Sequence, residues 1–122
     1  MRIERKIIDD IAIFELKGKF QIGNGVEELR SVLDSTINEG FKKIIFVMND
    51  IPYVDSVGLG ELVGSYTKIL KKGGKLLICG LTNKVRELFS VTKLLTAFKV
   101  KDTLESAIEE LREASDKEKD NF

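Results

Sequence analysis

One short segment contains the side chain best placed for chemistry. It reads Asp55-Ser56-Val57-Gly58-Leu59-Gly60 and lies between an apolar run and a helical pattern. The hydroxyl of Ser56 can accept hydrogen bonds from the free backbone N–H groups of the first helical turn, a capping role worth about 1 kcal/mol. A hydroxyl on such a short loop can also be reached by another protein. The local sequence leaves both interpretations of Ser56 open.

The two glycines of this segment also need a reason. Glycine in a first helical turn costs up to about 1 kcal/mol relative to alanine. We expect Gly58 and Gly60 to allow another backbone to come close.

Several classes of catalytic site are excluded by composition. The chain has no histidine, so Ser-His-Asp and Cys-His relays and the commonest zinc sites are ruled out. The lone Cys79 follows a buried apolar run, and we interpret it as inert packing. Adjacent acids such as Glu27-Glu28 and Glu109-Glu110 point about 100° apart on a helix and form poor acid–base pairs. The sequence therefore predicts no enzyme, no metal and no cofactor.

Charge and hydropathy predict one soluble domain. The 122 residues include 20 basic and 20 acidic side chains, and 43% of the residues are hydrophobic. A net charge of zero argues against nucleic-acid binding, and we interpret the lysines at positions 68, 71, 72 and 75 as a solvated helix end. No apolar stretch approaches the roughly 18 residues of a membrane span, and no signal-peptide core is present. We expect a cytoplasmic protein, by default a monomer when free.

Periodicity divides the chain into alternating elements. A hairpin turns at Asp9-Asp10, and helical spacing covers about 26 to 39 and 56 to 72. The unbroken apolar run 44–48 is typical of a central strand covered on both faces. Further patterns predict a strand at 75–79, a short helix around 85–89, a last short strand at 97–100 and a helix capped by Thr103.

This order predicts an α/β fold with a mainly parallel central sheet, an antiparallel N-terminal edge hairpin and about four helices. Residues 1–115 would form one domain and residues 116–122 a charged tail. Sites on such sheets lie at the carboxyl ends of the strands, which is where the loop 49–60 falls. On the helix after Ser56 we expect a core face, with Leu62, Val63, Tyr66 and Ile69 as its members.

The whole layout resembles the anti-sigma factor antagonists of bacteria, small stand-alone members of the STAS domain family. The resemblance covers about residues 4 to 111. It rests on Gly18-Lys19-Phe20, the central strand, Tyr53-Val54-Asp55-Ser56-Val57-Gly58-Leu59-Gly60, Gly73-Gly74-Lys75-Leu76, Val85-Arg86-Glu87-Leu88-Phe89 and Thr103-Leu104-Glu105-Ser106-Ala107.

The resemblance implies partner switching. The unmodified antagonist would bind an anti-sigma factor that is also a serine kinase, phosphorylation of Ser56 would end that binding, and a serine phosphatase would restore it. We expect the partner-binding residues to be Gln21, Asn24, Asp55, Ser56, Gly58, Gly60 and Glu61. Two positions depart from many relatives: Val57 stands where they carry Ser or Thr, and Gln21 where they carry an acid.

Two other interpretations remain open at this point. A phospho-aspartate receiver would use acids such as Asp9-Asp10 with Asp50 or Asp55 to hold magnesium, but the doublet enters a second strand at once and is expected at the opposite end of the sheet. A ligand-sensing STAS module for a nucleotide or lipid is the alternative function, although the third glycine, Gly64, falls one residue too late for a dinucleotide fingerprint.

Overall fold

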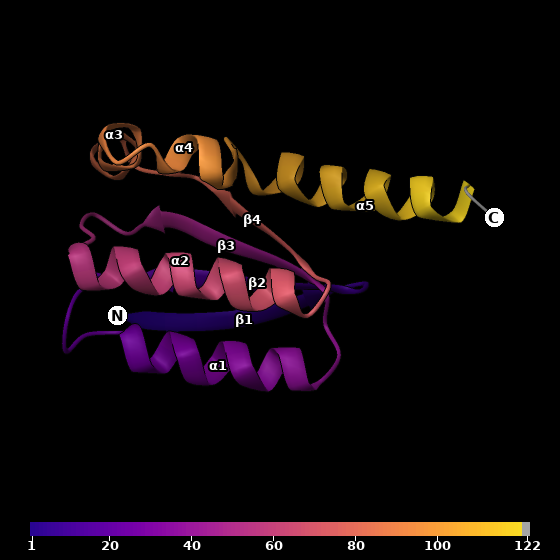
Figure 1. Ribbon diagram of the computed structural model, residues 1–122, viewed down its shortest axis with the longest axis horizontal. Coiled ribbons are helices and arrows are strands. Elements are labelled where there is room, and N and C mark those ends of the chain that lie inside the picture. The colour runs from indigo at the N-terminus through magenta and orange to yellow at the C-terminus, as the bar shows by residue number, and fades with distance from the viewer. Residues whose placement is uncertain (121–122) are drawn as a thin grey trace.

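Five strands form one sheet in the order in which they occur along the chain. The computed structural model describes residues 1–120, with side chains as far as Glu113, and Figure 1 shows the sheet between its helices. The elements are β1 (Arg2–Ile8), β2 (Ile11–Lys17), α1 (Val26–Asn38), β3 (Lys43–Asp50), α2 (Ser56–Lys71), β4 (Lys75–Cys79), α3 (Asn83–Val91), α4 (Leu94–Ala97), β5 (Lys99–Lys101) and α5 (Leu104–Asp120). The β1–β2 pair is antiparallel and the other pairs are parallel, which confirms the predicted fold class.

The β1–β2 turn lies at the end of the sheet opposite Ser56. The start of β2 pairs with the start of β3, Ile11 with Lys43, whereas Ser56 follows the far end of β3. Asp10 pairs with Lys43 at 2.9 Å and Asp9 pairs with Arg112 at 2.8 Å. Both acids are thus neutralised far from the other candidates, and the receiver interpretation is contradicted.

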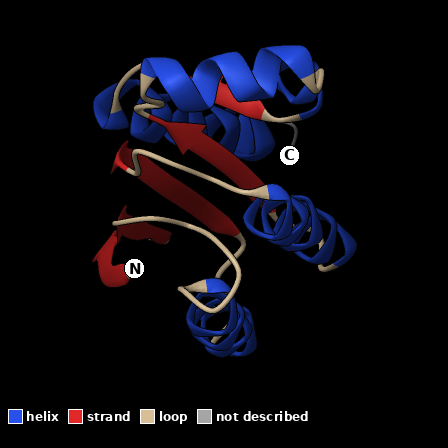
Figure 2. Cartoon of the chain, turned by 90° about the vertical axis from the view of Figure 1, so that its left-hand side faces the viewer, coloured by secondary structure: helices blue, strands red, loops and turns tan. Residues whose placement is uncertain are grey.

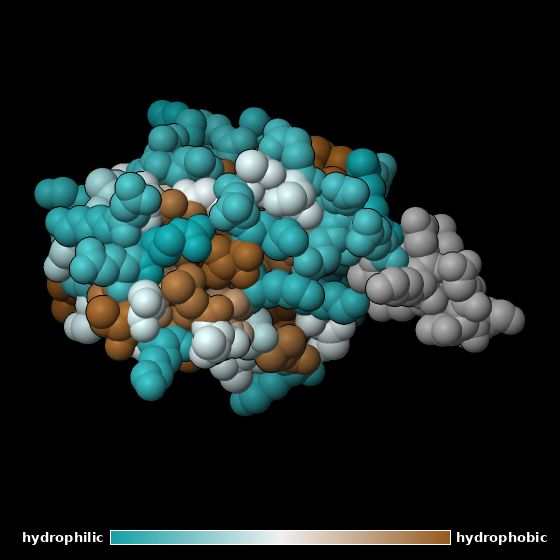
Figure 3. Space-filling model, turned by 90° about the horizontal axis from the view of Figure 1, so that it is seen from above, coloured by the Kyte–Doolittle hydropathy of each residue, from teal (hydrophilic) through white to brown (hydrophobic). Residues whose placement is uncertain are grey.

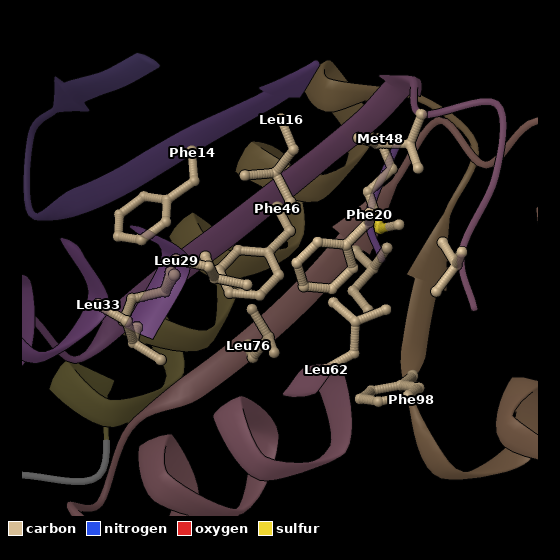
Figure 4. Close-up of a cluster of buried hydrophobic side chains, with 14 of the residues drawn as sticks. Phe14, Leu16, Phe20, Leu29, Leu33, Phe46, Met48, Leu62, Leu76 and Phe98 are labelled. Atoms are coloured by element: carbon tan, nitrogen blue, oxygen red, sulfur yellow. The ribbon is translucent and has the colours of Figure 1, made fainter. Parts of the chain in front are cut away.

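The central strand has an apolar face on each side, as its unbroken apolar run predicted. Phe46 stacks on Phe14 of β2 with ring centroids 5.5 Å apart, on the face covered by α1 and α2 (Figure 4). On the other face Ile45 packs in a smaller cluster with Ala107 and Leu111 of α5. Burial of an aromatic or aliphatic side chain contributes roughly 1.5–3 kcal/mol, so these two clusters stabilise the sheet beneath the loops.

Three details differ from the pattern-based expectations. The helix α4 was not predicted. It is separated from α3 by Thr92 and Lys93, and the φ of Lys93 is left-handed at 63°. The helix α5 continues to Asp120, into the segment predicted as a tail, and residues 121–122 lie outside the described part. Val63 is 41% exposed and is not a core residue, whereas Leu62 and Ile69 are buried. Val63 lies on the exposed side of α2, with Gly64 and Thr67.

Among the described residues, no helix combines the length and the apolar composition needed to cross a bilayer.

Candidate functional site

Two loops at the carboxyl ends of the parallel strands are joined by backbone hydrogen bonds. Figure 2 looks onto this end of the molecule, where the loops leave β2 and β3 for their helices. Gly18 donates to the carbonyl of Asp50 at 2.9 Å, and Phe20 donates to that of Tyr53 at 3.0 Å. Asp55 donates in return to the carbonyl of Phe20 at 3.1 Å. The β2–α1 loop and the β3–α2 loop therefore form one unit.

Ser56 is the first residue of α2 and is exposed at this end. Its hydroxyl makes no hydrogen bond to any part of the chain that the structure describes. The capping role considered for Ser56 belongs instead to Asp55, whose carboxylate Oδ1 accepts from the Gly58 N–H at 2.8 Å. Because Asp55 satisfies the helix terminus, the Ser56 oxygen is left free to react with or contact another molecule.

The carboxylate of Asp55 also holds the neighbouring loop. Its Oδ2 accepts from the Ile22 N–H at 3.0 Å, so one side chain links the start of α2 to the β2–α1 loop. The backbone N–H groups of Gly58 and Ile22 lower the pKa of Asp55 because they stabilise the ionised form. Asp55 is therefore an internal brace as well as a neighbour of Ser56.

This brace predicts a specific acid sensitivity. Because the folded state holds the pKa of Asp55 below its ordinary value, the stabilisation is fully present above the unfolded-state pKa of about 3.9 and is lost as the pH falls through the folded-state pKa. Urea unfolding of the wild type and of Asp55→Asn between pH 6 and pH 2.5 should converge at the acid end. A constant difference in unfolding free energy across that range would contradict the role of the carboxylate charge.

Gly58 allows two backbone segments of the protein itself to come close, which corrects its assignment as a partner contact. It is buried, and a Cβ at this position would lie 2.4 Å from the carbonyl oxygen of Phe20. The ring of Phe20 is fully buried near Met48 and Leu62 (Figure 4). Gly60 is different, because a Cβ there meets nothing within 4 Å and the residue is exposed.

The remaining predicted contacts fall into two groups. Gln21 and Asn24 are half-buried and close a tight turn on each other, with the Asn24 N–H 2.9 Å from the Gln21 carbonyl. Glu61 forms an ion pair with Arg30 of α1 at 2.8 Å, and its side chain is only 11% exposed. The turn thus lies at the same end of the molecule as Ser56, in the two joined loops. Glu61 instead links α1 to α2 through its ion pair.

Sequence reasoning missed the apolar side chains around Ser56. Ile22 is 71% exposed, Val57 is 40% exposed and Tyr53 is 39% exposed. Ile22, Val57 and the start of α1 line a hollow of about 360 Å³. Figure 3 looks onto the side of the molecule that carries α3, α4 and α5, where further apolar patches lie between charged side chains. The available signal was an isoleucine isolated among turn residues, where a polar side chain is usual.

Cys79 takes no part in this end of the molecule. The side chain is fully buried, and burial raises the pKa of its thiol to about 11, with a smaller contribution from Glu105. A thiol with that pKa is protonated and unreactive at neutral pH, as the packing interpretation requires.

Comparisons with known proteins agree on the fold and on the class of protein. The STAS domain family matches residues 2–107. A Thermotoga maritima protein named as an anti-sigma factor antagonist is 33% identical over 107 residues, which are 88% of this chain and 95% of that protein. The crystal structure of an anti-sigma factor antagonist from Thermotoga maritima superposes with a TM-score of 0.84 at 32% identity, over 90% of this chain and 94% of the other.

A more distant structure has been solved in two states. SpoIIAA, an anti-sigma factor antagonist of Bacillus, matches with a TM-score of 0.73 in its unphosphorylated form, at 20% identity over 91% of this chain and 98% of the other. Its phosphorylated form matches with a TM-score of 0.71, at 20% identity over 90% of this chain and 99% of the other. These two likenesses bear on the fold alone.

The chain belongs to the STAS domain family, because the match covers most of its length and the five-stranded sheet has the corresponding architecture. Within that family it groups with the anti-sigma factor antagonists, which are regulatory proteins.

Proposed function

We propose that this protein is an antagonist that acts by partner switching in the cytoplasm. The unphosphorylated form, a monomer when free, binds an anti-sigma factor that is also a serine kinase and so frees the sigma factor. Phosphorylation of Ser56 ends the binding, and a serine phosphatase restores it. The observation that carries this proposal is the exposed Ser56 hydroxyl, free of intramolecular hydrogen bonds within the described residues.

The fold itself can accept a phosphate at this position. Phosphorylation adds about −1.5 to −2 charges, and the N-terminus of a helix stabilises an anion by roughly 0.3–1 kcal/mol. Ser56 is the first residue of the 16-residue helix α2, so its phosphate would lie at that positive end. We therefore expect the modified protein to stay folded.

A bound partner cannot accept the same charge. A surface that meets a neutral hydroxyl would enclose the phosphate without a counter-ion, at a cost of several kcal/mol. The carboxylate of Asp55 beside it adds a like charge, and its lowered pKa keeps it ionised at neutral pH. The switch is thus electrostatic and local to the interface.

The relatives support the assignment to this class of protein. The Thermotoga maritima protein carries the name of this class and matches the chain over nearly its whole length. SpoIIAA, which shares the fold, has structures in both a phosphorylated and an unphosphorylated form.

Phosphosite mapping tests the proposal. A kinase-type ATPase captured from the native cytoplasm with this protein as bait, once purified, should transfer phosphate from ATP to Ser56 alone. We expect Ser56→Ala to abolish incorporation, while Ser31→Ala, which alters an exposed serine of α1, should leave it unchanged. Phosphate that persists on Ser56→Ala would overturn the proposal.

A further inference from the structure

The turn beside Ser56 has the features of a binding anchor. We propose that Ile22 is the apolar anchor of the partner-binding surface and that Asp55 is the positioning residue that fixes it beside Ser56. This inference rests on the proposed function, because the partner assigned to the surface is the kinase that phosphorylates Ser56.

The backbone of the turn directs Ile22 outward. Gln21 to Asn24 form a four-residue turn closed by the Asn24 N–H and the Gln21 carbonyl, with Gly23 at a φ of +75° in the third position. A positive φ there is typical of a type II turn, in which the second residue lies at the corner. Ile22 occupies that corner, and its own N–H is not used to close the turn.

The side chain of Ile22 is available to a partner. At 71% exposed, it keeps most of a large aliphatic side chain in water, at the same end of the molecule as the Ser56 hydroxyl. Residues that dominate binding are usually large side chains near the centre of an interface, surrounded by contacts that exclude water. Val57, 40% exposed, lies across the adjoining hollow and extends the apolar area toward Ser56.

Asp55 removes the freedom that an exposed turn would otherwise have. Its Oδ1 accepts from Gly58 at the start of α2 and its Oδ2 accepts from Ile22, at 2.8 and 3.0 Å. The turn is therefore held to the same helix terminus that presents Ser56. Fixing a loop in its bound arrangement improves affinity because less conformational entropy is lost on binding.

The chemistry of the occupant follows from the surroundings of Ile22. The hollow beside it is lined by Val26 and Val57, by the exposed acids Glu27 and Glu28, and by Arg30. The charge of Arg30 is balanced by its ion pair with Glu61, so the two acids leave the rim negative. The complementary surface is an apolar recess for Ile22 with a basic side chain facing the rim. We assign that surface to the kinase, next to the place where it receives the Ser56 hydroxyl.

A double-mutant cycle on the full chain tests both parts, with the purified kinase as the probe. Ile22→Ala should weaken binding at least tenfold and leave the unfolding midpoint unchanged, because the side chain is mostly exposed. The matched control is Leu70→Ala, which shortens a 48% exposed side chain 14 residues after Ser56 in α2. This variant should bind normally.

The positioning role has its own readout. The Asp55→Asn side chain has one acceptor oxygen in place of two, so it should speed hydrogen exchange of the Ile22 amide and weaken binding about fivefold. In the Ile22→Ala background the same change should cost less than twofold, because there is no anchor left to position. Additive effects, or an unchanged Ile22 amide, would overturn the positioning role.

The outcomes separate this inference from the proposed function. Normal binding by Ile22→Ala, together with loss of binding by Ser56→Asp, would overturn the anchor and leave the switch intact. Equal binding by the wild type and Ser56→Asp would overturn the proposed function, and the anchor with it.

Discussion

Ser56→Asp is expected to weaken binding of the kinase at least about 30-fold, which corresponds to roughly 2 kcal/mol or more. The carboxylate places a charge where the partner meets a neutral hydroxyl, next to the ionised Asp55. Because Ser56 is the first residue of α2, an acid there also complements the helix dipole. The variant should therefore be as stable as the wild type, so lost binding cannot be ascribed to unfolding.

Ser56→Asn is the matched control for charge. It has nearly the same size and shape as the Asp variant but is neutral, and we expect its affinity to stay within about threefold of the wild type. Binding by calorimetry and unfolding in urea, measured on both variants, give the comparison. Equal affinity of the Asp and Asn variants would show that charge at residue 56 does not control the interaction.

Gly58→Ala is expected to lower the free energy of unfolding by about 1–3 kcal/mol. The added Cβ would lie 2.4 Å from the Phe20 carbonyl oxygen, so the two loops must separate. Overpacking of this kind costs about 1–3 kcal/mol, and disturbance of the Asp55 cap adds about 1 kcal/mol. The gain in helix propensity, about 1 kcal/mol, is too small to offset both.

Gly60→Ala separates packing from propensity. It lies two residues away in the same helix with no atom near its Cβ position, so propensity acts alone and should stabilise by about 0.5–1 kcal/mol. Chemical denaturation of both variants decides between the two effects. If they shift the unfolding midpoint in the same direction, the close approach of Gly58 to Phe20 has no energetic weight.

Much of the architecture could be predicted because its signals are local. The apolar run 44–48 and the helical spacing after Ser56 each predict their structure from a short stretch of sequence. Both elements are present, as β3 and α2. The errors came where the signal is weak over short range. The helix α4 has only four residues, and the charged end of α5 has no apolar stripe to mark it as helical.

The site divides in the same way. Ser56, Asp55 and the turn at Gln21 to Asn24 could be selected from the sequence, because a polar and glycine-rich segment between a strand and a helix is recognisable by itself. Their roles could not be told apart. Ser56 and Asp55 are both good helix caps, and only the backbone geometry shows that Asp55 takes the cap and leaves the Ser56 hydroxyl free.

From the sequence alone follow the class of fold, the end of the sheet where the candidate site lies and the residue that we propose is modified, because periodicity and strand order act over short stretches of chain. Tertiary structure alone decided that the loop of Phe20 and Ile22 lies against the start of α2, and that this contact requires glycine at position 58. Those pairings join residues more than thirty positions apart. Such contacts depend on how the strands align in the sheet, which no local pattern encodes.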